Sequence, residues 1–457
     1  MKKIYLGLSG LLAVHLLLLA NLRFTAWPEM FSFAYLINKG YLIYKDFHHA
    51  YQPLLPIILA FFYKTFGISI LVLKLVSWGI ILFSDLLIFT ISLKLFGRKV
   101  IALLPLAIFV ALQPAFDGNM VWYDTAILPT FLGATLIFLY WLGNRQRKYL
   151  FLSGVLLSVT LLIKQQSVLL VLAFLIFMIY KKATLKDYLN LFIGGIIPVI
   201  LVYSWLASIG VFRDYIFWTF TFPLKWLPKV PGYKTLPSKT DIVALAFLVL
   251  PLTNIFRSKL YRKKYELKLL LFLLLATFLQ AFPRFSFFHL QAWLVIFSLI
   301  IAVGFESMKR VRPLFSFPIL FVGLMLWVNK LPEFGQAVRF YGQEEIKLAE
   351  FIQKNSNISD KIYLLGPHSL TYVLSERTPP KPWIENYVWH FEIPGMEEKL
   401  LQGFSLSPPK IIIWSEPRPG PWYDLVTYQP EKVTDWIRAN YKKGEEVESG
   451  VFVWYKN

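Results

Sequence analysis

Residues 26–56 read AWPEMFSFAYLINKGYLIYKDFHHAYQPLLP, and this stretch decides how the rest of the chain is interpreted. It follows the first apolar segment and mixes eight aromatic residues with the polar residues Glu29, Lys45, Asp46, His48, His49 and Gln52. A connection between two apolar helices would not need this density of polar groups. We therefore predict that residues 26–56 form a functional loop at a membrane surface, held in place by the remaining chain.

The composition of the surrounding chain indicates a membrane protein. Apolar residues make up 57% of the sequence and charged residues only 16%, and the mean hydropathy is +0.56. Residues 1–337 hold 33 Lys and Arg against 11 Asp and Glu, in short clusters between apolar runs, which argues against a nucleic-acid partner. The sequence contains no cysteine, which excludes thiol catalysis, disulfides and Cys-ligated zinc.

Apolar runs long enough to cross a bilayer, about 17–25 residues each, or nearly so, recur through the first three quarters of the chain. We predict about eleven transmembrane helices, at residues 4–21, 68–96, 99–114, 125–142, 149–163, 166–180, 188–209, 240–256, 267–282, 286–304 and 313–331. The first has a basic start but no small-residue cleavage site, so we interpret it as an uncleaved helix.

Basic clusters on alternate connections predict the orientation. They are Lys2-Lys3, Arg98-Lys99, Arg145-Arg147-Lys148, Lys181-Lys182-Lys186, Arg257-Lys259-Arg262-Lys263-Lys264 and Lys309-Arg310-Arg312. With eleven spans all six fall on the cytoplasmic side. The N-terminus is then cytoplasmic, and residues 26–56 and the C-terminal segment lie outside the cytoplasmic membrane.

Two shorter helices are predicted near the outer surface. Residues 28–39 have helix-compatible apolar spacing and end at Gly40, and residues 54–66 form a short apolar stretch before Gly67. Both are expected to lie along the membrane interface.

After Lys330 the composition changes to that of a small α/β domain. We predict helices at 344–353, 369–374 and 430–441 and strands at 361–365, 410–414 and 451–455. The domains are thus predicted as a transmembrane domain over residues 1–337, with the outer catalytic loop 26–56, and an extracytoplasmic α/β domain over residues 338–457.

Glu29 is the first candidate for a catalytic base, because Pro28 fixes its position near the end of the first span. A carboxylate favoured by the helix dipole at a helix start is the structural alternative. Asp46 is a second catalytic candidate. His48 and His49 are candidates for acceptor or metal binding, although adjacent histidines point in different directions on any regular element, and a solvated loop with incidental histidines is the alternative.

Asp117 and Asp124, in the next outer loop, are further candidates for acceptor or metal binding, and N-capping of the following helix is an adequate structural account of Asp124. Lys164, Arg284 and His289 lie at outer helix ends, where they are placed to bind a phosphate or, alternatively, to reach lipid headgroups. Asp85 lies in mid-span, and its simplest explanation is an interhelical partner.

Several motifs are absent from the sequence. It contains no GxxxxGK[ST], GxGxxG, HExxH or GxSxG. A nucleotide-hydrolysing transporter or a zinc protease is therefore disfavoured.

The run from WPE to KGYLIYKDFHHAYQPLLPIILAFFYKTFG resembles the first periplasmic loop of C-type (GT-C fold) integral membrane glycosyltransferases, the group of protein O-mannosyltransferases and aminoarabinose transferases. The stretches YDTAILP, LLIKQQSVLL and FPRFSFFHLQ are similar to recurring stretches of bacterial members. The resemblance implies a polyprenyl-phosphate-linked sugar donor, an inverting transfer outside the cytoplasmic membrane and Glu29 as base. Two positions depart from the family pattern: Pro28 replaces the usual Asp, and Gln52 replaces a phosphate-binding Lys.

We therefore predict a glycosyltransferase that moves a sugar from a polyprenyl-phosphate carrier to an extracytoplasmic acceptor, which is a cell-surface glycan, lipid or protein. A divalent metal is a possible cofactor. The alternatives are a membrane transporter or lipid flippase, which would need polar residues through the membrane midplane, and a non-catalytic assembly factor whose outer domain binds partners.

Overall fold

The computed structural model describes the chain except for residues 1, 98, 231–232, 258–263, 308–311 and 416–429. The described residues form two compact units. The first comprises Met1–Phe24, Leu73–Val202 and Thr235–Gln336, and the second Thr25–Val72, Tyr203–Lys234 and Ala337–Asn457. The second unit thus contains the loop 26–56 together with the C-terminal segment. The predicted domain boundary at residues 337 and 338 stays a prediction.

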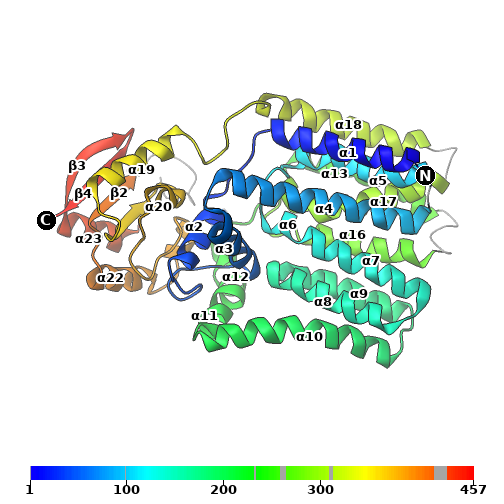
Figure 1. Ribbon diagram of the computed structural model, residues 1–457, viewed down its shortest axis with the longest axis horizontal. Helices are drawn as coiled ribbons and strands as arrows, with labels where there is room; N and C mark the ends of the chain where they lie inside the picture. Colours follow the sequence, from blue (N-terminus) through cyan, green and yellow to red (C-terminus); the bar gives the residue numbers. More distant parts are fainter. Residues whose placement is uncertain (1, 98, 231–232, 258–263, 308–311, 416–429) are drawn as a thin grey trace. The chain divides into compact units, whose positions relative to one another are not determined.

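The first unit is a bundle of helices (Figure 1). Its main elements are α1 (Lys2–Asn21), most of α4 (Ile70–Phe96), α5 (Leu104–Leu112), α6 (Tyr123–Ala126), α7 (Leu128–Asn144), α8 (Arg147–Ile163), α9 (Val168–Tyr180), most of α10 (Leu185–Ser208), α13 (Lys239–Val249), α14 (Leu252–Arg257), α16 (Tyr265–Leu279), α17 (Gln291–Ser307) and α18 (Arg312–Lys330). Short 3-10 helices at Val100–Leu103, Pro114–Phe116, Gln165–Ser167, Phe287–Leu290 and Leu331–Glu333 join some of them.

Five helical segments of the described chain are long and apolar enough to cross a membrane: Lys2–Asn21, Ile70–Phe96, Tyr123–Asn144, Leu185–Ser208 and Phe287–Glu306. Each of the eleven predicted spans overlaps a helix, but the number of crossings and their orientation stay predictions. Part of the basic clusters used for the orientation, namely Arg98, Lys259, Arg262, Lys263, Lys309 and Arg310, lies outside the described residues.

Helix α17 lies at the centre of this bundle. It packs against α5, α14, α16 and α18, and every residue from Leu290 to Val303 is buried. By contrast, α1 and α10 leave most of their apolar side chains exposed. Apolar surface exposed in this way on a bundle's outer helices is what lipid contact requires.

Glycines bring α8 and α10 into close contact. A Cβ atom on Gly154 would collide with the backbone oxygen of Leu191, and one on Gly194 with the backbone oxygen of Phe151. Ser158 of α8 donates a hydrogen bond to the carbonyl oxygen of Gly195 at 2.5 Å. Small residues at a helix–helix interface let the two backbones approach closely. In a membrane, where the hydrophobic effect does not drive helix association, this close packing does.

The interhelical partner predicted for Asp85 is confirmed. His15 Nδ1 of α1 lies 2.8 Å from Asp85 Oδ2 of α4, and His15 Nε2 lies 3.1 Å from Gln113 Oε1. All three side chains are fully buried. These contacts pair His15 with Asp85 and Gln113 inside the bundle, while Asp85 Oδ1 has no hydrogen-bond partner among the described residues.

The second unit contains both interfacial helices predicted from the sequence, α2 (Pro28–Asn38) and α3 (Leu54–Phe66). Proline is favourable at the first position of α2, because its missing N–H would have no partner there. Gly40 and Gly67 follow the two helices with positive φ angles of 78° and 82°, which glycine adopts without steric cost. The short helices α11 (Phe212–Ile216) and α12 (Phe222–Lys225), a π-helix (Phe217–Thr221) and a 3-10 helix (Leu227–Lys229) also belong to this unit.

The C-terminal part of the second unit is built around a four-stranded sheet. Figure 1 labels β2, β3 and β4 of this sheet near the C-terminus. The strand order is β1 (Ile362–Leu365), β2 (Ile411–Ser415), β4 (Val451–Lys456), β3 (Tyr441–Glu448); β1 and β2 are parallel and the other pairs antiparallel. The helices are α19 (Gln343–Asn355), α20 (Leu370–Ser375), α21 (Val388–Phe391), α22 (Met396–Leu406) and α23 (Glu431–Asn440). The predicted small α/β fold is confirmed.

Three elements of this part are missing from the sequence prediction, namely α21, α22 and β3. Strand β3 carries Lys442, Lys443, Glu445 and Glu446, all of them exposed, so it lacks the apolar alternation that indicates a strand. Charged residues are typical of an edge strand, where they oppose pairing with another chain.

Candidate active site

Glu29 lies in the first turn of α2 and is only 3% exposed. The Tyr387 hydroxyl donates a hydrogen bond to Glu29 Oε1. The other carboxylate oxygen, Oε2, is buried and has no hydrogen-bond partner among the described residues. An unpaired buried carboxylate oxygen is energetically unfavourable in a resting protein, and it is free to accept a proton from a bound molecule.

A second glutamate, Glu385, is near Glu29 and equally buried, with 5% exposure. Ser369 donates to Glu385 Oε2 at 2.5 Å, and the backbone N–H of Asn386 donates to Oε1 at 3.0 Å. The Ser369 hydroxyl also lies 3.1 Å from the hydroxyl of Ser32, one turn after Glu29 on α2. Hydrogen bonds therefore fix Glu385 relative to the helix that carries Glu29.

Burial and mutual repulsion change the acidity of this carboxyl pair. Burial raises the pKa of Glu29, and the neighbouring Glu385 carboxylate raises it further. Burial also raises the pKa of Glu385, although its hydrogen bonds from Ser369 and Asn386 act in the opposite direction. Two such carboxyls titrate as a pair and hold on to a proton at a pH where exposed glutamates are ionised. Their pKa values thus move toward the neutral range in which a general base works best.

Sequence reasoning missed Glu385. The residue lies in KPWIENYVWHF, where an acidic side chain stands among aromatic residues, as Glu29 does in the first loop. An acidic residue within an aromatic-rich segment is therefore the sequence signal that could have identified Glu385.

Asp46 lies in the turn after α2. Its Oδ2 accepts hydrogen bonds from the backbone N–H of Leu42 at 2.9 Å and from Lys381 at 2.6 Å. The first contact closes the turn, and the second ties the turn to the segment that contains Lys381. Asp46 therefore has a structural role in this unit.

His48 and His49 are buried and point to different neighbours. The His48 ring stacks on Trp218 with 4.1 Å between the centroids, whereas His49 Nε2 lies 3.2 Å from the carbonyl oxygen of Gln52. Burial, together with the nearby His390, lowers the pKa of His48 well below its usual value, and burial lowers that of His49 to about 3. Both imidazoles are therefore neutral.

No group of three or more His, Cys, Asp or Glu residues in the described part of the chain is arranged to hold a metal ion. The metal-binding alternative for His48, His49, Asp117 and Asp124 therefore has no ligand set within the described residues. Gln52 is 2% exposed, and its Oε1 accepts a hydrogen bond from Tyr215 at 3.1 Å.

In the first unit, Asp124, Lys164 and His289 come together. Lys164 donates to Asp124 Oδ1, and His289 Nδ1 lies 2.9 Å from Asp124 Oδ2. The Asp124 and Lys164 side chains are only 3% and 2% exposed. The N-capping interpretation of Asp124 is wrong: the N-cap of α6 is Trp122, and the Thr125 hydroxyl accepts its backbone N–H. The Asp124 carboxylate is buried next to the Lys164 ammonium, and it neutralises the charge of that ammonium.

Asp117 and Arg284 are the remaining candidates. Asp117 is half exposed and binds Lys330, which also binds Glu333 at 2.8 Å. Arg284 lies in a segment fixed by backbone hydrogen bonds, because Thr235 accepts from Phe285 and donates to Pro283. Its side chain is half-buried.

Comparison with protein families gives a match to part of the chain. A family described as dolichyl-phosphate-mannose-protein mannosyltransferase matches residues 48–207, from the end of the first loop through α10. No curated protein sequence matches the chain.

Solved structures are similar over nearly the full length. ArnT from Cupriavidus metallidurans, in the apo state, is 10% identical with a TM-score of 0.66, covering 99% of this chain and 97% of ArnT. ArnT bound to undecaprenyl phosphate gives 9% identity and a TM-score of 0.63, covering 99% and 98%. The oligosaccharyltransferase AglB from Archaeoglobus fulgidus, in complex with an inhibitory peptide and a dolichol-phosphate, gives 12% identity and a TM-score of 0.55, covering 100% and 74%.

The chain thus has the fold of the C-type membrane glycosyltransferases. The resemblance predicted from the first loop is confirmed at the level of the fold, and the family match covers the end of that loop, from residue 48, and the helices that follow it.

Proposed function

We propose that the protein is an inverting glycosyltransferase that uses a polyprenyl-phosphate-linked sugar and acts outside the cytoplasmic membrane. The observation that carries the proposal is the buried Glu29 with its unpartnered Oε2, next to Glu385. The fold it shares with ArnT, which binds undecaprenyl phosphate, supports the donor class.

In the proposed reaction a hydroxyl of the acceptor attacks the anomeric carbon of the donor sugar. The bond from that carbon to the phosphate oxygen breaks, polyprenyl phosphate leaves, and Glu29 Oε2 takes the proton of the attacking hydroxyl. Tyr387 holds the other oxygen of Glu29, so the free oxygen has a defined direction. The contacts of Asp46 with Leu42 and Lys381 favour a positioning role for this second catalytic candidate.

Lys164, Arg284 and His289 are the proposed ligands of the donor phosphate. Charge-assisted hydrogen bonds from such cations stabilise a leaving phosphate. Asp124 partners both Lys164 and His289 and so holds these two proposed ligands close together.

The experiment for the enzyme class uses purified protein and a panel of polyprenyl-phosphate sugars, with donor consumption as the readout. We expect the parent to consume at least one donor, and Glu29→Gln to slow consumption by about 10²–10⁴-fold, the usual contribution of a general base. Glu344→Gln, an exposed glutamate in the first turn of α19, is the matched control and should behave as the parent. A parent that neither binds nor consumes any donor would contradict the class. Full activity of Glu29→Gln would contradict only the choice of base.

Donor binding is measured separately, with undecaprenyl phosphate. Arg284→Gln should weaken its binding. Lys164 is tested only together with Asp124, as Lys164→Gln with Asp124→Asn, because replacing one member of this buried ion pair alone would leave a net charge buried at the site. Unchanged binding in both variants would refute the phosphate assignment.

A further inference from the structure

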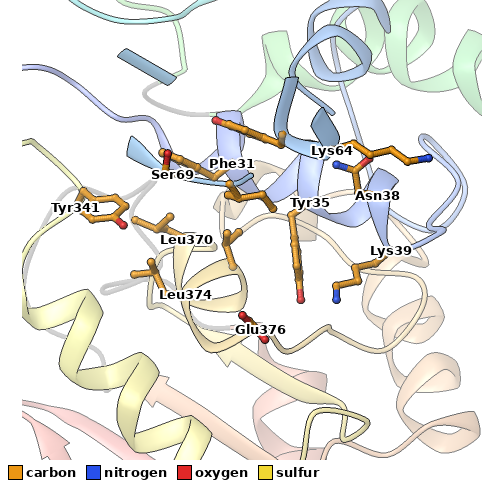
Figure 2. A pocket seen from close by; sticks show the side chains of 13 residues that line it. Phe31, Tyr35, Asn38, Lys39, Lys64, Ser69, Tyr341, Leu370, Leu374 and Glu376 are labelled. Atoms are coloured by element: carbon orange, nitrogen blue, oxygen red, sulfur yellow. The ribbon is translucent and has the colours of Figure 1, made fainter. Parts of the chain in front are cut away.

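A second candidate site lies within the second unit, where α2, α3 and α20 enclose a cavity of about 570 Å³ (Figure 2). Its lining includes Phe31, Tyr35 and Asn38 from one face of α2, Tyr63 from α3 and Leu370 from α20. The volume lies within the range of about 300–1,000 Å³ that is usual for sites of small ligands. Glu29 and Glu385 are not among the lining residues, so this cavity is distinct from the carboxyl pair.

Two buried hydroxyls in the lining have no partner. Tyr35 and Tyr63 are 3% and 2% exposed, and neither phenolic oxygen has a hydrogen-bond partner among the described residues. Buried tyrosine hydroxyls usually find a partner, because leaving one unpaired costs free energy. Figure 2 draws the Tyr35 hydroxyl at the end of the ring that faces Lys39 and Glu376. Both hydroxyls would be satisfied by a ligand that donates or accepts hydrogen bonds.

The charged residues of the lining carry both signs. Lys39 and Lys64 are exposed, and so is Glu376, where the chain leaves α20. The Lys39 ammonium lies 5.4 Å from the centre of the Tyr35 ring. A ligand in this cavity therefore meets hydrogen-bond donors and hydrogen-bond acceptors close together.

Aromatic and aliphatic side chains form the remaining walls. The rings of Phe31 and Tyr63 are stacked, with 2° between their planes, and the half-buried Tyr341 lies with its centroid 6.0 Å from that of Phe31. Leu370, Val373 and Leu374 of α20 add aliphatic surface. A ligand that fits has apolar faces as well as polar edges.

We propose that this cavity binds a saccharide and is the site at which an acceptor glycan is held. The ring of a sugar presents C–H faces to aromatic and leucine side chains, and its hydroxyls both donate and accept hydrogen bonds. Naming the occupant as the acceptor rests on the function proposed above, whereas the binding of a saccharide does not.

Two other ligand classes fit less well. An alkyl chain would leave the hydroxyls of Tyr35 and Tyr63 and three charged groups without partners. A simple phosphate would meet Glu376 as well as the two lysines and would make no use of the aromatic walls. A hydroxyl-rich ring compound uses all the groups present.

The test measures binding of cellotetraose, chitotetraose and mannotetraose to the full-length protein in detergent, by saturation-transfer NMR and calorimetry, without any lipid donor. Tetra-alanine and inorganic phosphate are the comparison probes. Tyr35→Phe and Tyr63→Phe each remove one unpartnered hydroxyl and should weaken binding of the tetrasaccharide about twofold to tenfold, as expected for one hydrogen bond between neutral groups. Neither variant should melt below the parent, because the hydroxyl lost has no partner in the ligand-free protein.

Tyr363→Phe is the matched control. The Tyr363 hydroxyl is also buried and without a partner among the described residues, but Tyr363 does not line the cavity. The inference is refuted if no tetrasaccharide binds at millimolar concentration, if the peptide or phosphate binds instead, or if Tyr363→Phe weakens binding as much as the two cavity variants. Since no donor is present, any of these results would leave the proposed donor chemistry untouched.

Discussion

Replacing Glu385 with glutamine should move the acidic limb of the pH–rate profile to lower pH. A base must be deprotonated to act, so the rate of the parent rises with pH through the raised pKa of Glu29. Glu385→Gln removes the repulsion but leaves Glu29 buried. Burial is the largest of the causes that act on the pKa of Glu29, so the limb should move toward 4.5, the ordinary pKa of a glutamate, without reaching it.

The assay is donor consumption at saturating donor between pH 4.5 and 9, for the parent, Glu385→Gln and Glu29→Gln. At the plateau the rate of Glu29→Gln should lie about 10²–10⁴-fold below that of the parent, which corresponds to about 3–5 kcal/mol at 1.36 kcal/mol per tenfold change. The pH–rate profile of this variant should also lack the acidic limb. A limb that stays in place in Glu385→Gln, or persists in Glu29→Gln, would refute the reasoning.

Three other outcomes are expected. The free energy of unfolding should fall as pH rises from 4.5 through the raised pKa values of Glu29 and Glu385, because the folded state binds more protons than the unfolded state in this range. The double variant Glu29→Gln with Glu385→Gln should show a flatter dependence on pH in denaturant titrations. Asp124→Asn should cost about 3–5 kcal/mol by stranding the ammonium that it neutralises, measured by thermal unfolding in detergent, and the double variant with Lys164→Gln should recover much of the loss. Gly154→Ala should lower the melting temperature because its Cβ meets α10, whereas Gly79→Ala, with nothing within 4 Å, should not.

The sequence predicted those elements that follow from local patterns. Apolar periodicity placed helices at 28–39 and 54–66, close to α2 and α3, because each carries its own buried face and ends at a glycine. Strand β3 escaped prediction because charged residues, rather than alternating apolar ones, form this edge.

Pairings between distant residues could not be read from local patterns. Glu29 was a candidate from its own surroundings, but Tyr387 and Glu385 approach it only through the fold of the C-terminal part. Asp124 was an acceptor or metal candidate with a helix cap as its structural alternative, because a capping position is visible locally. Its actual partners are distant in sequence: Lys164 follows α8, and His289 lies in the 3-10 helix Phe287–Leu290. A carboxylate at a helix start is compatible with both roles, and only the packing decides between them.

Helix α2 carries Glu29 and Ser32 on one side and Phe31, Tyr35 and Asn38 on another, within eleven residues. Inserting or deleting one residue between Trp27 and Glu29 would turn both sets by about 100° at once, so neither could be re-aimed alone. A redesign of the saccharide specificity proposed for the cavity should therefore vary α3 and α20 and leave the sequence of α2 intact.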